Sequence, residues 1–472
     1  MLSLGQSKMF RCVERVFRFF GAAAMATCLL VGGHSAWAAE TSEFSDEPIP
    51  MKTPDELPAR TPPLVEVGPD FLGPGNIPEG IELPTGAVWT PALWVFGSYR
   101  TALQYFDRGP TDQLEEWRNR LDLFANVHMT PTERLLVGIS PLRDGSDFSG
   151  CDLSSGGSEC EWHTDLDVTT VFVEGEFGEI FPNLDPDDSR ALDVGFSVGR
   201  QLLFFQEGMM LNDTVDGVGV TRDNIILPGI VDLRITGFFG WDNIDREPSL
   251  DGGATTLLGL FTETDFRKST FNLDATWVIG SSNENAIGDT FNIGASSVQR
   301  VGLYNTAFRV NHSMAFNPAG QKTTDGTLFF AESSTTPAYS HDVAYLNAFL
   351  GLDSFTSAAR DPIAGGPLAR VGILFAGVGL GNYGSALSND PDDSYGAALG
   401  YQKFFNQQRT QLVLELGGRG HIDGVNPAAG ALGLRLQHAL GDRTLLQIDG
   451  FASVNEDQAD GQGLRAELLF RF

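Results

Sequence analysis

The last eleven residues of the chain alternate between apolar and polar side chains. They read QGLRAELLFRF, and every second residue from Leu464 to Phe472 is apolar. Arg465, Glu467 and Arg471 fall between them. Since successive side chains of a strand point to opposite faces, this pattern predicts a strand with one apolar and one largely polar face.

The same period of two recurs from residue 92 to the end of the chain. Short polar turns such as 267–269, 406–409 and 441–443 alternate with longer loops rich in glycine and aspartate, an arrangement typical of outer-membrane barrels. The pattern predicts an all-β, transmembrane antiparallel β-barrel of about 18 strands, with 16 also possible. The predicted strands are 93–105, 117–129, 135–142, 167–179, 191–204, 229–241, 255–265, 270–280, 289–300, 304–316, 326–335, 342–352, 367–379, 395–405, 410–421, 429–440, 444–455 and 462–472.

This set of strands contains a conflict of parity. If 267–269 and 406–409 are both short turns at one end of a barrel, one strand more or fewer than this set must lie between them. The stretch 205–228 is a candidate for a hidden strand, around Val218 to Ile226, and 367–395 is ambiguous. An even number of strands is needed for both chain ends to meet at one side.

A soluble β-sandwich or propeller would also show alternating strands. Several apolar faces, however, carry aromatic residues near the predicted strand ends, among them Tyr99, Trp241, Trp277 and Phe470. Such placement is typical of the aromatic girdles of membrane barrels. No repeat of 40 to 50 residues recurs, as propeller blades would require. We therefore favour a barrel over residues 89–472.

Residues 1–38 have the parts of a secretory signal peptide. Basic residues precede an apolar run from Phe19 to Val31, and Ala36-Trp37-Ala38 supplies the small residues of a cleavage site. The run of about 13 residues is shorter than the ~20 that span a bilayer as a helix. The formal net charge of −30 falls to about −33 when the basic leader is removed, which does not suit nucleic-acid binding.

Residues 39–88 are rich in proline and acidic side chains. Proline prevents both a regular helix and strand pairing, so an extended segment is expected. Three roles stay open for it: a periplasmic tail, a plug that enters the barrel, or a ligand for a periplasmic partner.

Charged residues fall on the strand faces opposite the apolar ones. A charge costs ~2–4 kcal/mol on the lipid side at mid-membrane, so we expect these faces to line the interior. They either keep the lumen hydrated and filter solutes, or form salt bridges that stiffen the wall, and the two roles are compatible. The predicted pore-lining residues are Arg100, Arg118, Arg120, Asp122, Arg200, Asp232, Arg234, Arg309, Arg419, Arg435, Arg465 and Glu467.

Two cysteines remain after the leader is removed. Cys151 and Cys160 lie in a loop rich in glycine and serine, and we expect a disulfide between them in an exported protein. His163 alone is too few ligands for a metal, so no metal site and no cofactor are predicted. No combination of nucleophile, base and orienting group is evident, so no catalysis is predicted.

Three stretches resemble the bacterial alginate-export family of outer-membrane proteins. Gly199-Arg200-Gln201 is followed by Gly208 and by an Asp-Gly-Val element that ends at Val218, and Arg118-x-Arg120-Leu121 and Val171 to Glu174 match the first third of that family. The resemblance implies an 18-stranded monomer that passes anionic polysaccharide along Arg118, Arg120 and Arg200. Arg200 shares the parity of apolar neighbours, so it reaches the lumen only if a bulge at Gly199 shifts the strand.

The sequence thus predicts a porin of a Gram-negative-type outer membrane that passes polar or charged small solutes by diffusion. The alternatives are an alginate-type polysaccharide exporter with a periplasmic feeding partner, and a plugged structural or adhesive barrel. The expected partners are membrane lipid and lipopolysaccharide, the barrel-assembly machinery through the C-terminal strand, and the solute itself, a small polar molecule or an anionic polysaccharide.

Overall fold

Residues 60–472 form one compact unit in the computed structural model of the chain. The residues that the structure describes are 61–71, 79–109, 113–130, 132–153, 159–166, 168–187, 192–246, 255–280, 288–316, 323–422, 427–456 and 458–472. The predicted signal peptide and the first part of the proline-rich segment lie outside them.

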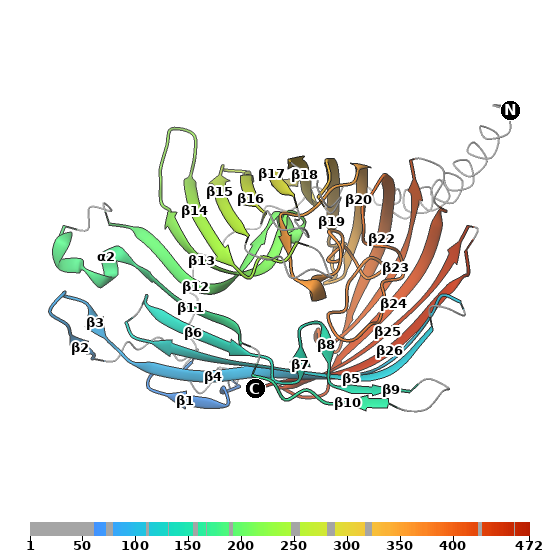
Figure 1. Cartoon of the computed structure of the whole chain (residues 1–472), viewed down its shortest axis with the longest axis horizontal. Helices are drawn as coiled ribbons and strands as arrows, with labels where there is room; N and C mark the ends of the chain where they lie inside the picture. Colours follow the sequence, from blue (N-terminus) through green and yellow to red (C-terminus); the bar gives the residue numbers. More distant parts are fainter. Residues whose placement is uncertain are drawn as a thin grey trace. The chain divides into compact units, whose positions relative to one another are not determined.

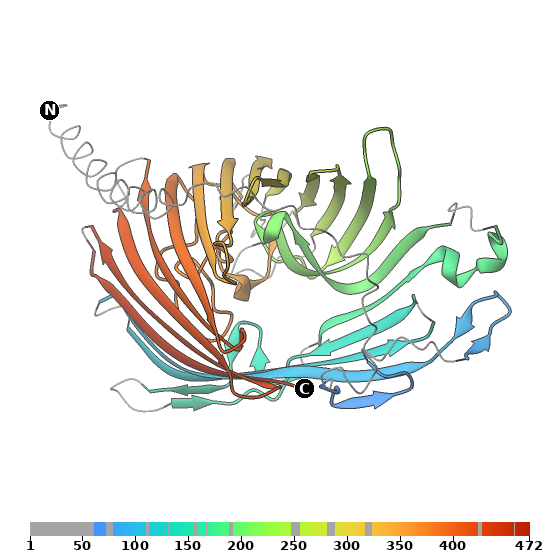
Figure 2. The same cartoon turned by 180° about the vertical axis from the view of Figure 1, so that it is seen from behind.

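Eighteen antiparallel strands close into a ring, which confirms the predicted fold class (Figures 1 and 2). Each pairs with the next, and the last pairs with the first from Gln462 opposite Asp107 to Arg471 opposite Ser98. The strands are β4 (Ala92–Asp107), β5 (Gln113–His128), β6 (Arg134–Ile139), β11 (Val168–Glu176), β12 (Val194–Phe205), β13 (Leu211–Arg222), β14 (Asp232–Asp242), β15 (Thr256–Asp265), β16 (Ser269–Ile279), β17 (Asp289–Val301), β18 (Tyr304–Phe316), β19 (Gly326–Thr335), β20 (Val343–Asp353), β22 (Ser394–Phe405), β23 (Thr410–His421), β24 (Ala429–Ala439), β25 (Thr444–Asn455) and β26 (Gly461–Arg471).

The predicted number of strands is confirmed although one member of the predicted set is wrong and one is missing. The stretch 205–228 does contain a strand, β13, whereas 367–379 is a loop. With β13 included, the turns after β15, β22 and β24 each follow an even-numbered strand of the ring. These three turns therefore lie at the end where β4 begins and β26 ends. The conflict of parity disappears because 367–379 is a loop, so six strands and not seven separate 267–269 from 406–409.

Shorter elements lie in the connections and before the first strand of the ring. Among the described residues, no helix is long and apolar enough to cross a bilayer. The short elements are β1 (Val65–Val67), β2 (Ile81–Glu82), β3 (Val88–Trp89), β7 (Arg143–Asp144), β8 (Asp147–Phe148), β9 (Gly150–Asp152), β10 (Glu159–Glu161), α2 (Phe177–Ile180), η2 (Pro182–Leu184), η3 (Gln206–Gly208), β21 (Ala359–Arg360) and η4 (Pro362–Ala364).

The described part of 39–88 lies at the end with the short turns. Val65 to Val67 pair with β4 beyond the point where β26 ends, and Trp94 donates a hydrogen bond from Nε1 to the carbonyl of Pro69 (2.9 Å). Residues 61–71 thus extend the wall of the ring.

The wall of the ring is inverted relative to a soluble protein. In β26, Leu464 is 58% exposed, whereas the adjacent Arg465 is 1% exposed and Glu467 is 5% exposed. A sandwich would bury the leucine in its core and leave the charged residues in water. The apolar side of the strand therefore faces outward, and the charged side faces the interior, as the alternation predicted.

The interior is largely occupied by one long connection. Residues 354–393, which we call the lumen loop, leave β20 and turn into the space enclosed by the strands before returning to β22 (orange in Figures 1 and 2). Leu368, Leu374 and Phe375 of this loop are buried in a hydrophobic cluster with Leu328 of β19 and Phe349 of β20. The apolar alternation that suggested a strand at 367–379 comes from this packing.

Candidate functional site

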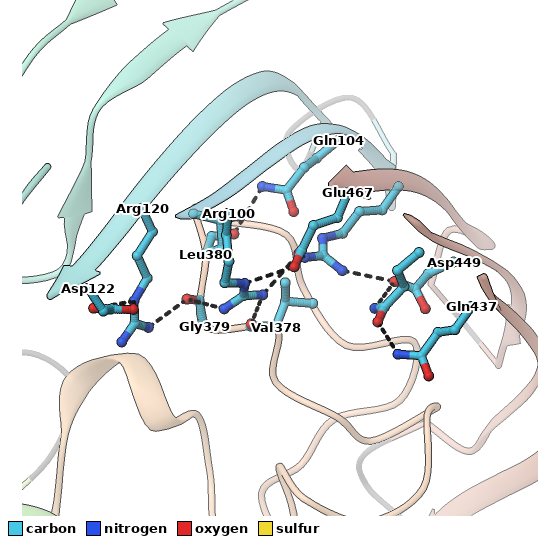
Figure 3. Close-up of polar contacts among 12 residues, drawn as sticks. Arg100, Gln104, Arg120, Asp122, Val378, Gly379, Leu380, Gln437, Asp449 and Glu467 are labelled. Atoms are coloured by element: carbon cyan, nitrogen blue, oxygen red, sulfur yellow. Dashed lines mark hydrogen bonds and ion pairs between the residues drawn. The ribbon is translucent and has the colours of Figure 1, made fainter. Parts of the chain in front are cut away.

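Arginines of the first two strands hold one stretch of the lumen loop by its backbone (Figure 3). Arg100 donates from Nη2 to the carbonyl of Val378 (3.1 Å) and from Nη1 to that of Gly379 (3.4 Å). Arg120 donates from Nη1 to the same Gly379 carbonyl (3.1 Å). A carbonyl shared by two guanidinium groups is a strong charge-assisted anchor. These arginines therefore fix the loop against the wall as well as lining the lumen.

A buried carboxylate continues this anchor. Glu116 of β5 is fully buried and accepts hydrogen bonds from the amide of Asn382 (2.8 Å) and from Nε2 of Gln104 (2.8 Å). Gln104 also donates to the carbonyl of Leu380 (2.9 Å). Arg118 forms an ion pair with Glu116 (2.8 Å), so the buried charge is compensated.

A row of alternating charges runs across the last three strands. Arg435 of β24 and Arg465 of β26 both form ion pairs with Asp449 of β25, and Arg465 also contacts Glu467. Glu467 in turn forms an ion pair with Arg100 (2.9 Å). Asp449, Arg465 and Glu467 in the middle of the row each have an opposite charge on both sides, an arrangement compatible with the predicted role of stiffening the wall.

The opposite part of the lumen loop is held by a carboxylate and an arginine of β23. Glu415 accepts hydrogen bonds from the amides of Ile373 (3.0 Å) and Leu374 (2.9 Å) and from the hydroxyl of Tyr345. Arg419 donates from Nη1 to the carbonyls of Ser388 (2.6 Å) and Asp390 (2.9 Å). The loop is thereby fastened to β23 as well as to β4 and β5, with three strands of the ring between the two anchors.

The turn between β12 and β13 also lies inside the ring. Arg360 of the lumen loop donates to the carbonyls of Gly208 and Met209 in this turn, and Leu211 and Asn212 pair with β21 as a short parallel ladder. The ring of Phe205 stacks on that of Phe261 in β15 at 3.4 Å between centroids. The turn and the lumen loop therefore narrow the interior together.

A cavity of about 490 Å³ remains between these inward segments and the inner faces of β17 to β20. Arg309 lies at its wall, 4% exposed, with Glu332 at 3.2 Å and Glu207 at 3.5 Å. Arg370 of the lumen loop is exposed and lies over the ring of Phe204 (4.9 Å); within the described residues it forms no ion pair with a carboxylate. Asn305, Phe330, Tyr345 and Asn347 also line the cavity.

The predicted pore-lining residues fall into three groups. Most take part in the charged contacts inside the ring, as described for Arg100, Arg118, Arg120, Arg309, Arg419, Arg435, Arg465 and Glu467, and Asp122 pairs with Arg120 (2.8 Å). Arg234 lies near the short-turn end of β14 and pairs with Glu263 (3.4 Å), with Asp232 two residues before it.

Arg200 forms the third group. It pairs with Asp216 at 2.8 Å, and the register with β11 and β13 runs through Gly199 without a shift. Arg200 therefore keeps the parity of Val198 and Leu202, which are exposed. The bulge that its lumen role required is absent from this pairing, and that expectation is corrected.

Sequence reasoning did not single out the residues that seat the lumen loop. Glu116, Arg360 and Tyr345 are unremarkable in sequence because their partners are backbone groups or residues of distant segments. The spacing Gly195-Phe196-Ser197-Val198-Gly199 matches GxSxG, but Ser197 lies within a strand and not on the strand-to-helix elbow that a hydrolase needs.

The predicted disulfide between Cys151 and Cys160 is present in the structure. The two cysteines face each other across β9 and β10, which extend the wall beyond β5 at the end with the long connections. Trp162 packs edge-on against Trp117 of β5 beside it (5.8 Å between centroids). The disulfide thus closes a small hairpin on the rim.

Comparison with solved structures places this ring among known barrels. OccK2 (OpdF) of Pseudomonas aeruginosa superposes with a TM-score of 0.53 at 12% identity, covering 80% of this chain and 97% of that one. The chain has the eighteen-stranded porin fold. OpdK of the same species, solved with vanillate, gives 0.52 at 13% identity over 80% and 98% of the two chains. OccK2 in complex with glucuronate gives 0.51 at 11% over 80% and 96%.

No protein-family model matches the chain, and no curated protein matches its sequence. The structural neighbours are porins of the OccK group, and the resemblance to the alginate-export family is not supported. The short stretches that carried it, around Arg118 and Gly199, belong to ordinary strands of the ring.

Proposed function

We propose that the chain is a passive channel in the outer membrane of a Gram-negative-type bacterium, through which small polar solutes cross down their gradients. The observation that carries the proposal is the inverted wall, with Leu464 exposed beside the buried Arg465. Such a wall is stable when acyl chains meet its outer side and water fills its inner side. The lumen loop narrows this passage, so it sets the size of the solute.

The arginines around the remaining cavity favour solutes that carry a carboxylate. Arg370 is exposed in it without an acidic partner among the described residues, and Arg309 lies at its wall. A guanidinium group binds a carboxylate through two parallel hydrogen bonds. The volume of about 490 Å³ is in the ~300–1,000 Å³ range of small-molecule sites. Vanillate and glucuronate, named with two structural neighbours, are both carboxylates.

The predicted pore-lining arginines then have an indirect part in selectivity. Arg100 and Arg120 position the carbonyls of Val378 and Gly379, and so they shape the narrow passage that a solute meets.

The lumen loop narrows the interior, which speaks against the polysaccharide-conduit alternative. The plugged-barrel alternative differs from ours in one measurable respect, which is whether ions pass. The lumen loop is the candidate plug among the described residues, because 61–71 of the proline-rich segment lie along the wall.

The experiment is single-channel recording of the full chain in planar bilayers. We expect discrete conductance steps, and a larger conductance when 357–390 is replaced by a short Gly-Ser linker. β20 and β22 pair directly, from Val343 opposite Gln402 to Leu350 opposite Tyr395, so the wall does not depend on the loop. A silent wild type that conducts only after the replacement would overturn the proposal and establish a plug.

The solute class is tested with Arg370→Ala. A unit charge ~8 Å from a passing ion attracts an anion and repels a cation by about 0.5 kcal/mol each in water. We therefore expect the anion-to-cation permeability ratio to fall about fivefold, measured from the reversal potential in a salt gradient. Uptake of glucuronate into liposomes should fall relative to glucose. Arg234→Ala is the matched control because that arginine is 48% exposed and lies at the short-turn end.

A further inference from the structure

Three potential metal ligands meet on the rim of the ring, away from the solute cavity. The side chains of Asp144, His163 and Asp165 each bring one ligand atom within 4.8 Å of the other two. Asp144 lies in the β7–β8 hairpin, and the other two follow β10. Both segments belong to the connection between β6 and β11, at the end with the long loops.

The ligand atoms of this cluster are not used by the protein. Among the described residues, neither Asp144 nor Asp165 forms an ion pair or accepts a hydrogen bond. Nε2 of His163 is shielded from solvent and has no hydrogen-bond partner there. An imidazole nitrogen that is desolvated without a partner is unfavourable, and two close carboxylates repel each other. A bound divalent cation would give the imidazole nitrogen a partner and would remove the repulsion between the carboxylates.

The backbone that carries the cluster is fixed by three independent contacts. The hydroxyl of Ser149 makes two hydrogen bonds to the backbone of His163: it accepts from the amide (2.9 Å) and donates to the carbonyl (3.3 Å). The Cys151–Cys160 disulfide and the contact of Trp162 with Trp117 hold the flanking residues. A site on such fixed segments loses little conformational entropy when it binds.

We propose that Asp144, His163 and Asp165 bind a zinc ion at the outer rim of the barrel. One imidazole and two carboxylates form a ligand set of the kind zinc accepts, with its fourth position left to water. Ligands ~2.1 Å from a tetrahedral zinc lie about 3.4 Å apart, so the side chains need to move inward by only ~1 Å.

The site would fasten the β7–β8 hairpin to the disulfide hairpin. The hairpin matters for the interior because Phe148 of β8 is buried against Ala102 of β4 and Leu380 of the lumen loop. Bound zinc therefore stabilises the contact between the rim and the lumen loop. This role does not depend on which solute passes.

The test is calorimetric titration of the full chain, folded in detergent and freed of metal by a chelator, with Zn²⁺ alone. We expect one Zn²⁺ per chain, and at least a tenfold weaker affinity in His163→Ala and in Asp144→Asn. Asp147→Asn is the matched control: Asp147 pairs with Asp144 across the hairpin and is exposed, but it is not one of the three ligands. Its affinity should equal that of the wild type.

Each other outcome counts against the site. If Zn²⁺ does not bind, or if Asp147→Asn weakens binding as much as Asp144→Asn, the cluster is only an acidic surface. If Ca²⁺ binds as tightly as Zn²⁺ and His163→Ala changes neither, the imidazole is not a ligand and the proposal is wrong. Intact disulfide and unchanged heat-dependent gel mobility would show that each variant is folded.

Discussion

Arg100 of β4 and Glu467 of β26 form an ion pair, with Nε and Oε1 2.9 Å apart, across the seam where the ring closes. The two residues are 367 positions apart in sequence. The same guanidinium group reaches the carbonyl of Val378, so one side chain joins the first strand, the last strand and the lumen loop.

The seam should be sensitive to the loss of this one carboxylate. In Glu467→Gln, both Arg100 and Arg465 lose a counter-charge inside the ring, and breaking a buried pair costs about 3–5 kcal/mol. We expect the free energy of unfolding in urea to fall by about this amount. Glu263→Gln, which breaks an exposed pair with Arg234, should cost less than about 1 kcal/mol. Equal losses in the two variants would contradict the assigned role.

Glu415 should determine how firmly the lumen loop is seated. In Glu415→Gln the Oε2 position becomes a donor that can no longer accept from the Tyr345 hydroxyl, and the negative charge that strengthens the bonds from the Ile373 and Leu374 amides is lost. We expect larger and noisier single-channel currents than in the wild type. Tyr345→Phe keeps the amide bonds and should have a smaller effect. Unchanged currents in Glu415→Gln would mean that other contacts hold the loop.

The end of the lumen loop should respond to pH. Burial, together with the nearby carboxylate of Asp390, raises the pKa of Asp392 to about 7 from its ordinary value of 3.8. Because the folded loop holds this proton more tightly than the unfolded chain, its contribution to stability is complete below about pH 4. It is lost as the pH rises through about 7.

We therefore expect amides of 388–393 to exchange with solvent faster at pH 8 than at pH 5, after correction for intrinsic exchange rates. In Asp392→Asn this difference should shrink, whereas Asp187→Asn, an exposed residue of the short-turn end, should keep it. A pH response that persists in Asp392→Asn would assign it to another group.

The disulfide on the rim should contribute to local stability. Closing a nine-residue separation stabilises the folded state by about 2–3 kcal/mol in the chain-entropy model. In Cys151→Ser with Cys160→Ser, we expect proteases to cleave the β9–β10 hairpin before the wall strands, as seen by mass spectrometry. The reduced wild type should be cleaved at the same rate as this double variant, and the oxidised wild type should be cleaved more slowly. Identical rates in all forms would exclude it.

The wall of this barrel could be predicted from sequence because the two faces of each strand meet different surroundings. In the proposed membrane setting, lipid outside and water inside impose a strict alternation, which β26 shows in Leu464 and Arg465. β13 was missed because Asp213 and Asp216 gave it the composition of a loop. Asp213 is buried inside the ring, where the strand bends inward with the β12–β13 turn.

The lumen loop could not be predicted because its neighbours are distant in sequence. Its apolar residues, such as Leu374, imitate a strand, while Gly372, Gly379 and Gly381 adopt positive φ angles that no strand tolerates at such density. The partners of Arg100 and Arg120 are backbone carbonyls of this loop, and a backbone carbonyl leaves no trace in a sequence pattern. The parity of the short turns was the available signal that one strand was misplaced.

Because β20 pairs directly with β22, the stability of the barrel wall and the selection of the solute depend on different parts of the chain. The wall of the barrel closes through hydrogen-bonded pairs between β20 and β22 that do not involve residues 354–393. The insert between these two strands can accordingly gain, lose or exchange residues without altering the pairs between β20 and β22. Changes confined to residues 354–393 can therefore alter which solutes pass while the strands of the barrel stay the same.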